Sequence, residues 1–113
     1  MKWSINKANS WYNKHNWLVG CNFLPSSSIN QLEMFQIETF DILTIKKEVK
    51  LASQIGFNVL RVFLHDLLWH NKKSLIKNLK IFLNICDEFN IKVNIVLFCD
   101  CWNPIAKLGK QPK

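Results

Sequence analysis

Short apolar runs alternate with amphipathic segments along the chain. The runs within 17–23, 56–69 and 91–102 predict three strands, the second of them followed by its outgoing loop. Between these runs, apolar residues recur at helical spacing over 41–56 and 71–90, which predicts two amphipathic helices. The order strand, helix, strand, helix, strand predicts an α/β fold with a parallel sheet and right-handed crossovers.

Capping residues bound both predicted helices. Asp41 precedes the first helix, where its carboxylate can accept hydrogen bonds from the open amides of the first turn. Asn71 or Ser74 has the same role before the second helix. Gly56 and Asn90 follow the two helices, and both residue types favour a left-handed helix ending.

The second strand has two different faces, because successive side chains of a strand point in opposite directions. Val62 and Leu64 share a wholly apolar face, which predicts a covering helix. Arg61, Phe63 and His65 share the other face, which predicts a polar cavity or polar partners. Arg61 is the only arginine among the 15 basic residues, and either a buried salt bridge or a role in a site would explain it.

Polar residues gather where the strands end. In parallel β/α units, ligands bind beyond the carboxyl ends of the strands. Asn22, His65, Asp66, Asp100 and Trp102 all lie at those ends and predict a site. Alternation along the third strand directs Asp100 and Trp102 to the cavity face, and it directs the neighbouring Cys99 to the helix face.

The connection 24–40 is long for a compact domain and rich in apolar residues, so we expect it to fold over the body. Glu33 and Glu38 in this connection lie near the same end as Asn22. They are either groups of the site or ordinary surface charges.

Residues 1–16 form an entry segment, in which Trp11 and Tyr12 are expected to anchor a short helix onto the body. The domain is then expected to hold its three strands and two helices within 17–104, and 105–113 to begin the following loop.

Composition excludes several classes of protein. The chain has 113 residues, 49% of them hydrophobic, and a formal charge of +7, which indicates one folded domain. Its lysines are scattered over predicted helix faces without a recognition motif, so we expect no nucleic-acid partner. No stretch is long enough to span a bilayer and no signal-peptide core follows the first residues. The chain as given is therefore expected in the cytoplasm without a membrane partner, with export of a full-length protein left open.

The 4 cysteines are too few to form a disulfide framework in a chain with this much core, so we expect buried thiols. A metal held by Cys21, His65, Cys99 and Cys101 is a weaker alternative. We expect no metal and no cofactor.

Several stretches carry a family resemblance. They are 18–26, 30–36, 38–41, 61–69, 98–104 and 109–112. In order and almost without gaps, they closely resemble the amino-terminal part of bacterial glycoside hydrolases of the cellulase-like family five type, often labelled β-1,4-xylanases or cellulases.

The resemblance implies an incomplete (β/α)₈ TIM barrel that covers about the first three strands. It also implies retaining hydrolysis of a β-linked polysaccharide such as xylan or cellulose, by an acid/base and a nucleophile about 5–5.5 Å apart. In the family these glutamates follow the fourth and seventh strands, so the chain alone is expected to be inactive and to need the carboxyl-terminal part of the barrel.

By the same resemblance, Arg61 supports the nucleophile, and Asn22, His65, Asp100 and Trp102 contact sugar or support those contacts. Glu33 and Asp66 join them as further binding or supporting residues through their nearness to the strand ends.

Two positions depart from the family pattern. Cys99 replaces an aspartate at the third strand, and Phe35 replaces a tryptophan in the long connection. A different class of function also stays open, namely a partial barrel that binds sugar or metal as a stand-alone module without turnover.

Overall fold

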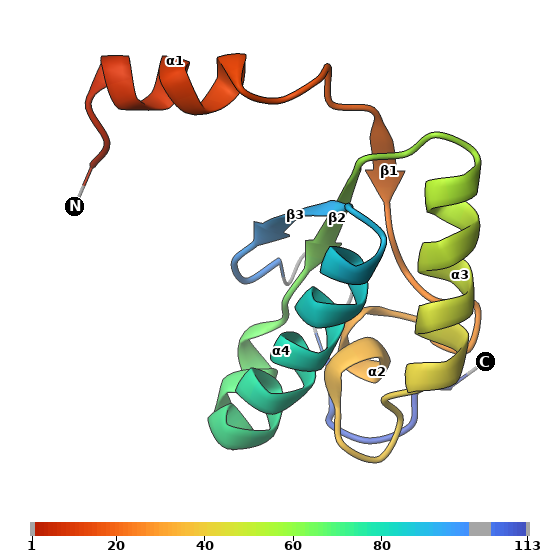
Figure 1. Ribbon diagram of the computed structural model, residues 1–113. Coiled ribbons are helices and arrows are strands. Elements are labelled where there is room, and N and C mark those ends of the chain that lie inside the picture. Colours follow the sequence, from red (N-terminus) through yellow and green to blue (C-terminus); the bar gives the residue numbers. More distant parts are fainter. Residues whose placement is uncertain (1, 100–104, 113) are drawn as a thin grey trace.

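The computed structural model describes residues 2–99 and 105–112. Its strands form one sheet in the order β1-β2-β3, with both pairs parallel, so the predicted α/β unit is confirmed (Figure 1). In chain order the elements are α1 (Ile5–Asn13), β1 (Gly20–Asn22), α2 (Gln31–Phe35), α3 (Ile42–Gln54), β2 (Val59–Phe63), the 3₁₀ helix η1 (Asp66–Asn71), α4 (Lys72–Glu88) and β3 (Lys92–Val96).

Helices α3 and α4 lie side by side on one face of the sheet (Figure 1). Lys46 Nζ of α3 lies 2.7 Å from Glu88 Oε2 of α4, and the Ser53 hydroxyl donates to the Phe89 carbonyl at 3.3 Å. Because both crossovers return over the same face, the described helices leave the opposite face uncovered.

The faces of β2 follow the predicted alternation. Val62 is 0% exposed and Leu64 is 3% exposed beneath the helices, whereas Arg61 on the opposite face is exposed. Parallel pairing sets Arg61 beside Asn22 of β1 and Asn94 of β3. The uncovered face therefore carries a row of polar side chains across its centre.

The connection 24–40 folds over the body as expected. Its short helix α2 buries Leu32, Met34 and Phe35, each 1% exposed. The Phe35 ring meets Phe82 of α4 edge to face at 5.9 Å between centroids, and the buried Asn78 of α4 donates to the Phe35 carbonyl at 3.0 Å. This connection thus completes the core above α4.

Asp41 caps α3 as predicted. Its carboxylate accepts the Thr44 amide at 3.1 Å and the Thr44 hydroxyl at 2.6 Å. These hydrogen bonds favour the ionised carboxylate and hold the pKa of Asp41 below its ordinary value.

The other helix boundaries also agree with the sequence. Asn71 caps α4 by accepting the Ser74 amide at 3.3 Å, which decides between the two predicted caps. Gly56 and Asn90 end the helices with positive φ values of 94° and 56°, as the predicted left-handed endings require.

The expected anchoring of the entry segment is wrong. Helix α1 forms, but none of its residues is buried, and Trp11 and Tyr12 remain 40% and 49% exposed. In Figure 1, α1 extends away from the sheet and its covering helices. Trp11 packs against Trp3 and His15 of its own segment rather than against the body. None of the described helices is long and apolar enough to cross a membrane.

Candidate functional site at the carboxyl ends of the strands

A cavity of about 520 Å³ opens at the carboxyl ends of β1 and β2. Asn22 and Phe63 line it from the strands, Asn30 and Gln31 from the start of α2, and Gln111 from the last described segment. Four carboxamides thus share the lining with apolar and aromatic side chains, around a space large enough for a small ligand.

Arg61 lies two positions before Phe63, the residue of β2 that lines the cavity. Its guanidinium carbon lies 4.7 Å from the centroid of the Phe63 ring, so the cation stacks on an aromatic side chain that lines the cavity. No carboxylate of the described residues lies within ion-pair distance of Arg61. Within that part of the chain, the buried salt bridge considered from the sequence is not formed.

His65 and Asp66 follow β2 and lie at the start of η1, where they do not line the cavity. His65 is 5% exposed, and its Nδ1 lies 2.8 Å from Asp66 Oδ1 and 3.2 Å from the Leu67 amide that it caps. The Asp66 side chain is 59% exposed. The predicted strand-end residues are therefore divided, with Asn22 at the cavity and this pair at the start of η1.

Glu33 is a buried carboxylate, only 4% exposed, and not a surface charge. Its Oε2 accepts the Ile29 amide at 2.7 Å and its Oε1 accepts the Gln111 amide at 2.8 Å. The Gln111 side chain in turn accepts from Asn30 at 3.1 Å and donates to the Gly109 carbonyl at 2.8 Å. Glu33 thereby joins the start of α2 to residues 105–112, beside the cavity.

We expect Glu33→Ala to release residues 105–112 from α2. The substitution leaves the Ile29 and Gln111 amides without their carboxylate acceptor, at a cost of about 1–3 kcal/mol for the buried Gln111 amide. Hydrogen exchange should show faster exchange at Gln111, while the amides of β2 keep their protection. Glu38→Ala is the matched control, because Glu38 is exposed. Unchanged exchange at Gln111 would contradict this role.

The third strand ends earlier than predicted. The Leu64 amide donates to the Val96 carbonyl at 3.0 Å, and the Leu64 carbonyl accepts from Cys99 at 2.8 Å. A regular parallel ladder would use the amide of Phe98 instead, so one extra residue is inserted here. Phe98 has a φ of 57°, which accommodates this bulge.

The predicted alternation of faces does not hold beyond Val96, because the bulge shifts the register by one residue before Cys99. Gln31 holds the shifted segment by donating to the Cys99 carbonyl at 2.8 Å. The predicted site residues Asp100 and Trp102 lie outside the described residues.

Sequence reasoning did not identify Gln31, Gln36 and Gln111 as organising residues. The carboxamides of Gln31 and Gln36 donate to backbone carbonyls 68 and 73 positions away. The carboxamide of Gln111 donates to the Gly109 carbonyl within its own segment. The only available signal was that 30–36 and 109–112 both belong to the resemblance, and this did not reveal that they contact one another.

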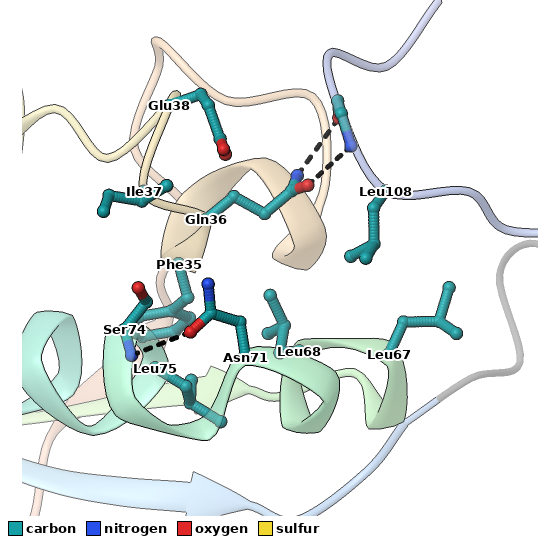
Figure 2. A pocket seen from close by; sticks show the side chains of 11 residues that line it. Phe35, Gln36, Ile37, Glu38, Leu67, Leu68, Asn71, Ser74, Leu75 and Leu108 are labelled. Atoms are coloured by element: carbon teal, nitrogen blue, oxygen red, sulfur yellow. Dashed lines mark hydrogen bonds between the residues drawn. The ribbon is translucent and has the colours of Figure 1, made fainter.

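A second cavity of about 270 Å³ lies on the other side of α2, between its end, η1 and the start of α4 (Figure 2). Gln36 closes one side, because its carboxamide donates to the Gly109 carbonyl at 3.1 Å and accepts the Gly109 amide at 2.6 Å. Glu38 lines this second cavity and not the first, so the two carboxylates of the long connection belong to different environments.

The expectation of buried thiols holds for Cys86 but not for Cys21. Burial raises the pKa of the Cys86 thiol to about 12, whereas Cys21 is exposed. Cys99 is half-buried, and Cys101 lies outside the described residues. Over residues 2–99 and 105–112, no group of three His, Cys, Asp or Glu side chains is arranged to hold a metal.

We expect a maleimide to label Cys21 and to spare Cys86 in the folded chain at neutral pH. The Cys86 thiol is buried and stays protonated, and only the thiolate reacts readily. Peptide mapping by mass spectrometry reports each site separately. Labelling in urea is the control and should modify both. Equal labelling rates in buffer would show that the packing around Cys86 is wrong.

Comparison with family models, curated proteins and solved structures gives no match for this chain. The relationship to glycoside hydrolases therefore stays a prediction from the resemblance.

Proposed function

We propose that this chain is the amino-terminal part of a retaining glycoside hydrolase that acts on a β-linked polysaccharide of the xylan or cellulose class. The observation that carries the proposal is the one-sided sheet. Three parallel strands in sequential order have both crossover helices on one face, as in a segment of a (β/α)₈ barrel. The uncovered face would become the interior of that barrel.

The residues on and beside this face support the proposal. Arg61 is exposed on it without an ion-pair partner among the described residues, as expected if its carboxylate comes from a later strand. The cavity with Asn22 and Phe63 lies at the carboxyl ends of the strands, where barrel enzymes bind substrate. The carboxamide of Asn22 would bind a sugar hydroxyl.

The chain by itself would not hydrolyse glycan, because by the resemblance the acid/base and the nucleophile follow the fourth and seventh strands. Asp66 is the only acidic residue among the predicted strand-end groups that the structure describes. Asp66 lies 2.8 Å from His65 at the start of η1 and does not line the cavity, and no carboxylate among residues 2–99 and 105–112 lines that cavity.

The test compares the purified chain with the chain joined to the product of any continuous downstream reading frame. Light scattering reports the oligomeric state, and release of reducing sugar from xylan and cellulose reports activity. We expect activity only in the joined protein, and we expect Arg61→Ala to reduce it by at least about 100-fold. Lys80→Ala, an exposed substitution on α4, is the control and should leave activity unchanged.

Two results would contradict the proposal. Turnover by the chain alone that is lost in Asp66→Asn would mean that three strands form a complete catalytic site. The stand-alone binding module would be favoured if the chain alone were monodisperse and bound xylo-oligosaccharide, and if no joined protein released reducing sugar.

A further inference from the structure

Helix α1 and its flanking residues expose an apolar surface that no described part of the chain covers. The exposed fractions are 49% for Trp3, 79% for Ile5, 40% for Trp11, 49% for Tyr12 and 76% for Trp17. Figure 1 shows α1 projecting from the body before β1. So many large apolar side chains in one short exposed segment indicate an interaction surface.

The charge of this segment indicates the kind of partner. Residues 1–32 contain Lys2, Lys7 and Lys14 but no aspartate or glutamate, the first acidic residue being Glu33. A second copy of the chain would bring its own charge of +7 against this surface. The partner that fits is therefore anionic and is not another copy.

The arrangement of the aromatic rings distinguishes a membrane surface from a sugar or a nucleic acid as the partner. Trp11 meets Trp3 at 6.5 Å and 65° and meets His15 at 4.4 Å and 67°, both edge to face. Lys7 Nζ lies 4.8 Å from the Trp3 ring centroid. Stacking on a sugar or a base needs open, parallel ring faces, whereas a clustered aromatic surface with lysines at its edge suits the headgroup layer of a membrane.

The distribution of apolar and polar residues around α1 also suits a membrane headgroup layer. Ile5, Ala8 and Tyr12 recur at intervals of three and four residues, so they share one side of α1 with Trp11 close by. Asn6, Ser10 and Asn13 lie toward the other side. A helix of this pattern can lie in the plane of a membrane surface without spanning it.

We propose that α1 is an interfacial helix that docks the chain onto an anionic lipid surface. Ile5, Trp11 and Tyr12 enter the headgroup layer, and Lys7 and Lys14 contact lipid phosphates. The sequence led us to expect no membrane partner because no segment can span a bilayer, but an interfacial helix needs no such segment. The proposed surface lies apart from the cavity at the strand ends, which no residue of α1 lines.

The test is flotation of the purified chain with phosphatidylcholine vesicles that contain roughly one third phosphatidylserine, compared with phosphatidylcholine alone. We expect binding to the anionic vesicles only. Trp11→Ser should weaken binding about tenfold, and Lys7→Gln with Lys14→Gln should weaken it about 25-fold, or fivefold for each lysine.

Matched controls remove the same groups from the body. Trp69→Ser removes an indole that is 54% exposed, and Lys72→Gln with Lys73→Gln lowers the net charge by the same amount. Both controls should bind vesicles like the original chain. Absence of binding, equal binding to neutral vesicles, or equal losses in the controls would overturn the proposal. So would binding to soluble xylan, rather than to vesicles, that Trp11→Ser abolishes.

Discussion

Phe82→Ala is expected to lower the free energy of unfolding by about 3–5 kcal/mol, the range for removing a fully buried aromatic side chain. Phe82 is 0% exposed. Its ring stacks on Phe23 at 5.8 Å and meets Phe35 edge to face at 5.9 Å. The substitution therefore empties the point where the end of β1, helix α2 and helix α4 meet.

Urea unfolding followed by circular dichroism measures this loss. Ile76→Ala on the same helix is the control, because Ile76 is 43% exposed, and it should cost about 1 kcal/mol or less. If the two variants were equally stable, the packing of α2 and β1 on α4 would be wrong. Phe82→Leu should recover part of the loss, since it refills most of the cavity.

Gly20→Ala is expected to destabilise the chain by about 3 kcal/mol or more, because it forces a backbone to move. A Cβ atom at Gly20 would lie 1.7 Å from the Val59 carbonyl oxygen of β2. Strand β1 has only 3 residues, so this clash separates much of its pairing with β2. Hydrogen exchange at the Phe23 amide, which donates to the Arg61 carbonyl at 2.8 Å, should become fast.

Gly56→Ala is the control for this substitution. A Cβ atom there would meet nothing within 4 Å, and its only cost is the φ of 94°. That strain costs about 1–2 kcal/mol for an L-residue. Slow exchange at Phe23 in Gly20→Ala would mean that β1 and β2 do not approach one another as described.

The helix boundaries and strand faces could be predicted because their causes are local. Asp41 and Asn71 accept amides three residues ahead, and Gly56 ends a helix through its own φ. Burial of Val62 and Leu64 follows from a period of two within one strand. None of these features depends on residues far along the chain.

The candidate site was predicted less completely. Asn22 was expected at the strand ends and does line the cavity there. His65 was expected on the cavity face, but the chain turns into η1 directly after it, and its imidazole caps that turn. The burial of Glu33 could not be predicted, because its carboxylate accepts the amide of Gln111, which lies 78 positions away.

The amino-acid sequence by itself determined the order of the three strands and of helices α3 and α4, the caps of those helices, and the division of β2 into an apolar and a polar face. Periodicity and capping act over a few residues, so the sequence records them directly. Only the tertiary structure decided that α1 stays exposed, that a bulge precedes Cys99, and that residues 105–112 return to α2. Each of these depends on which distant backbone groups become neighbours, and the spacing of residue types along a chain does not encode that proximity.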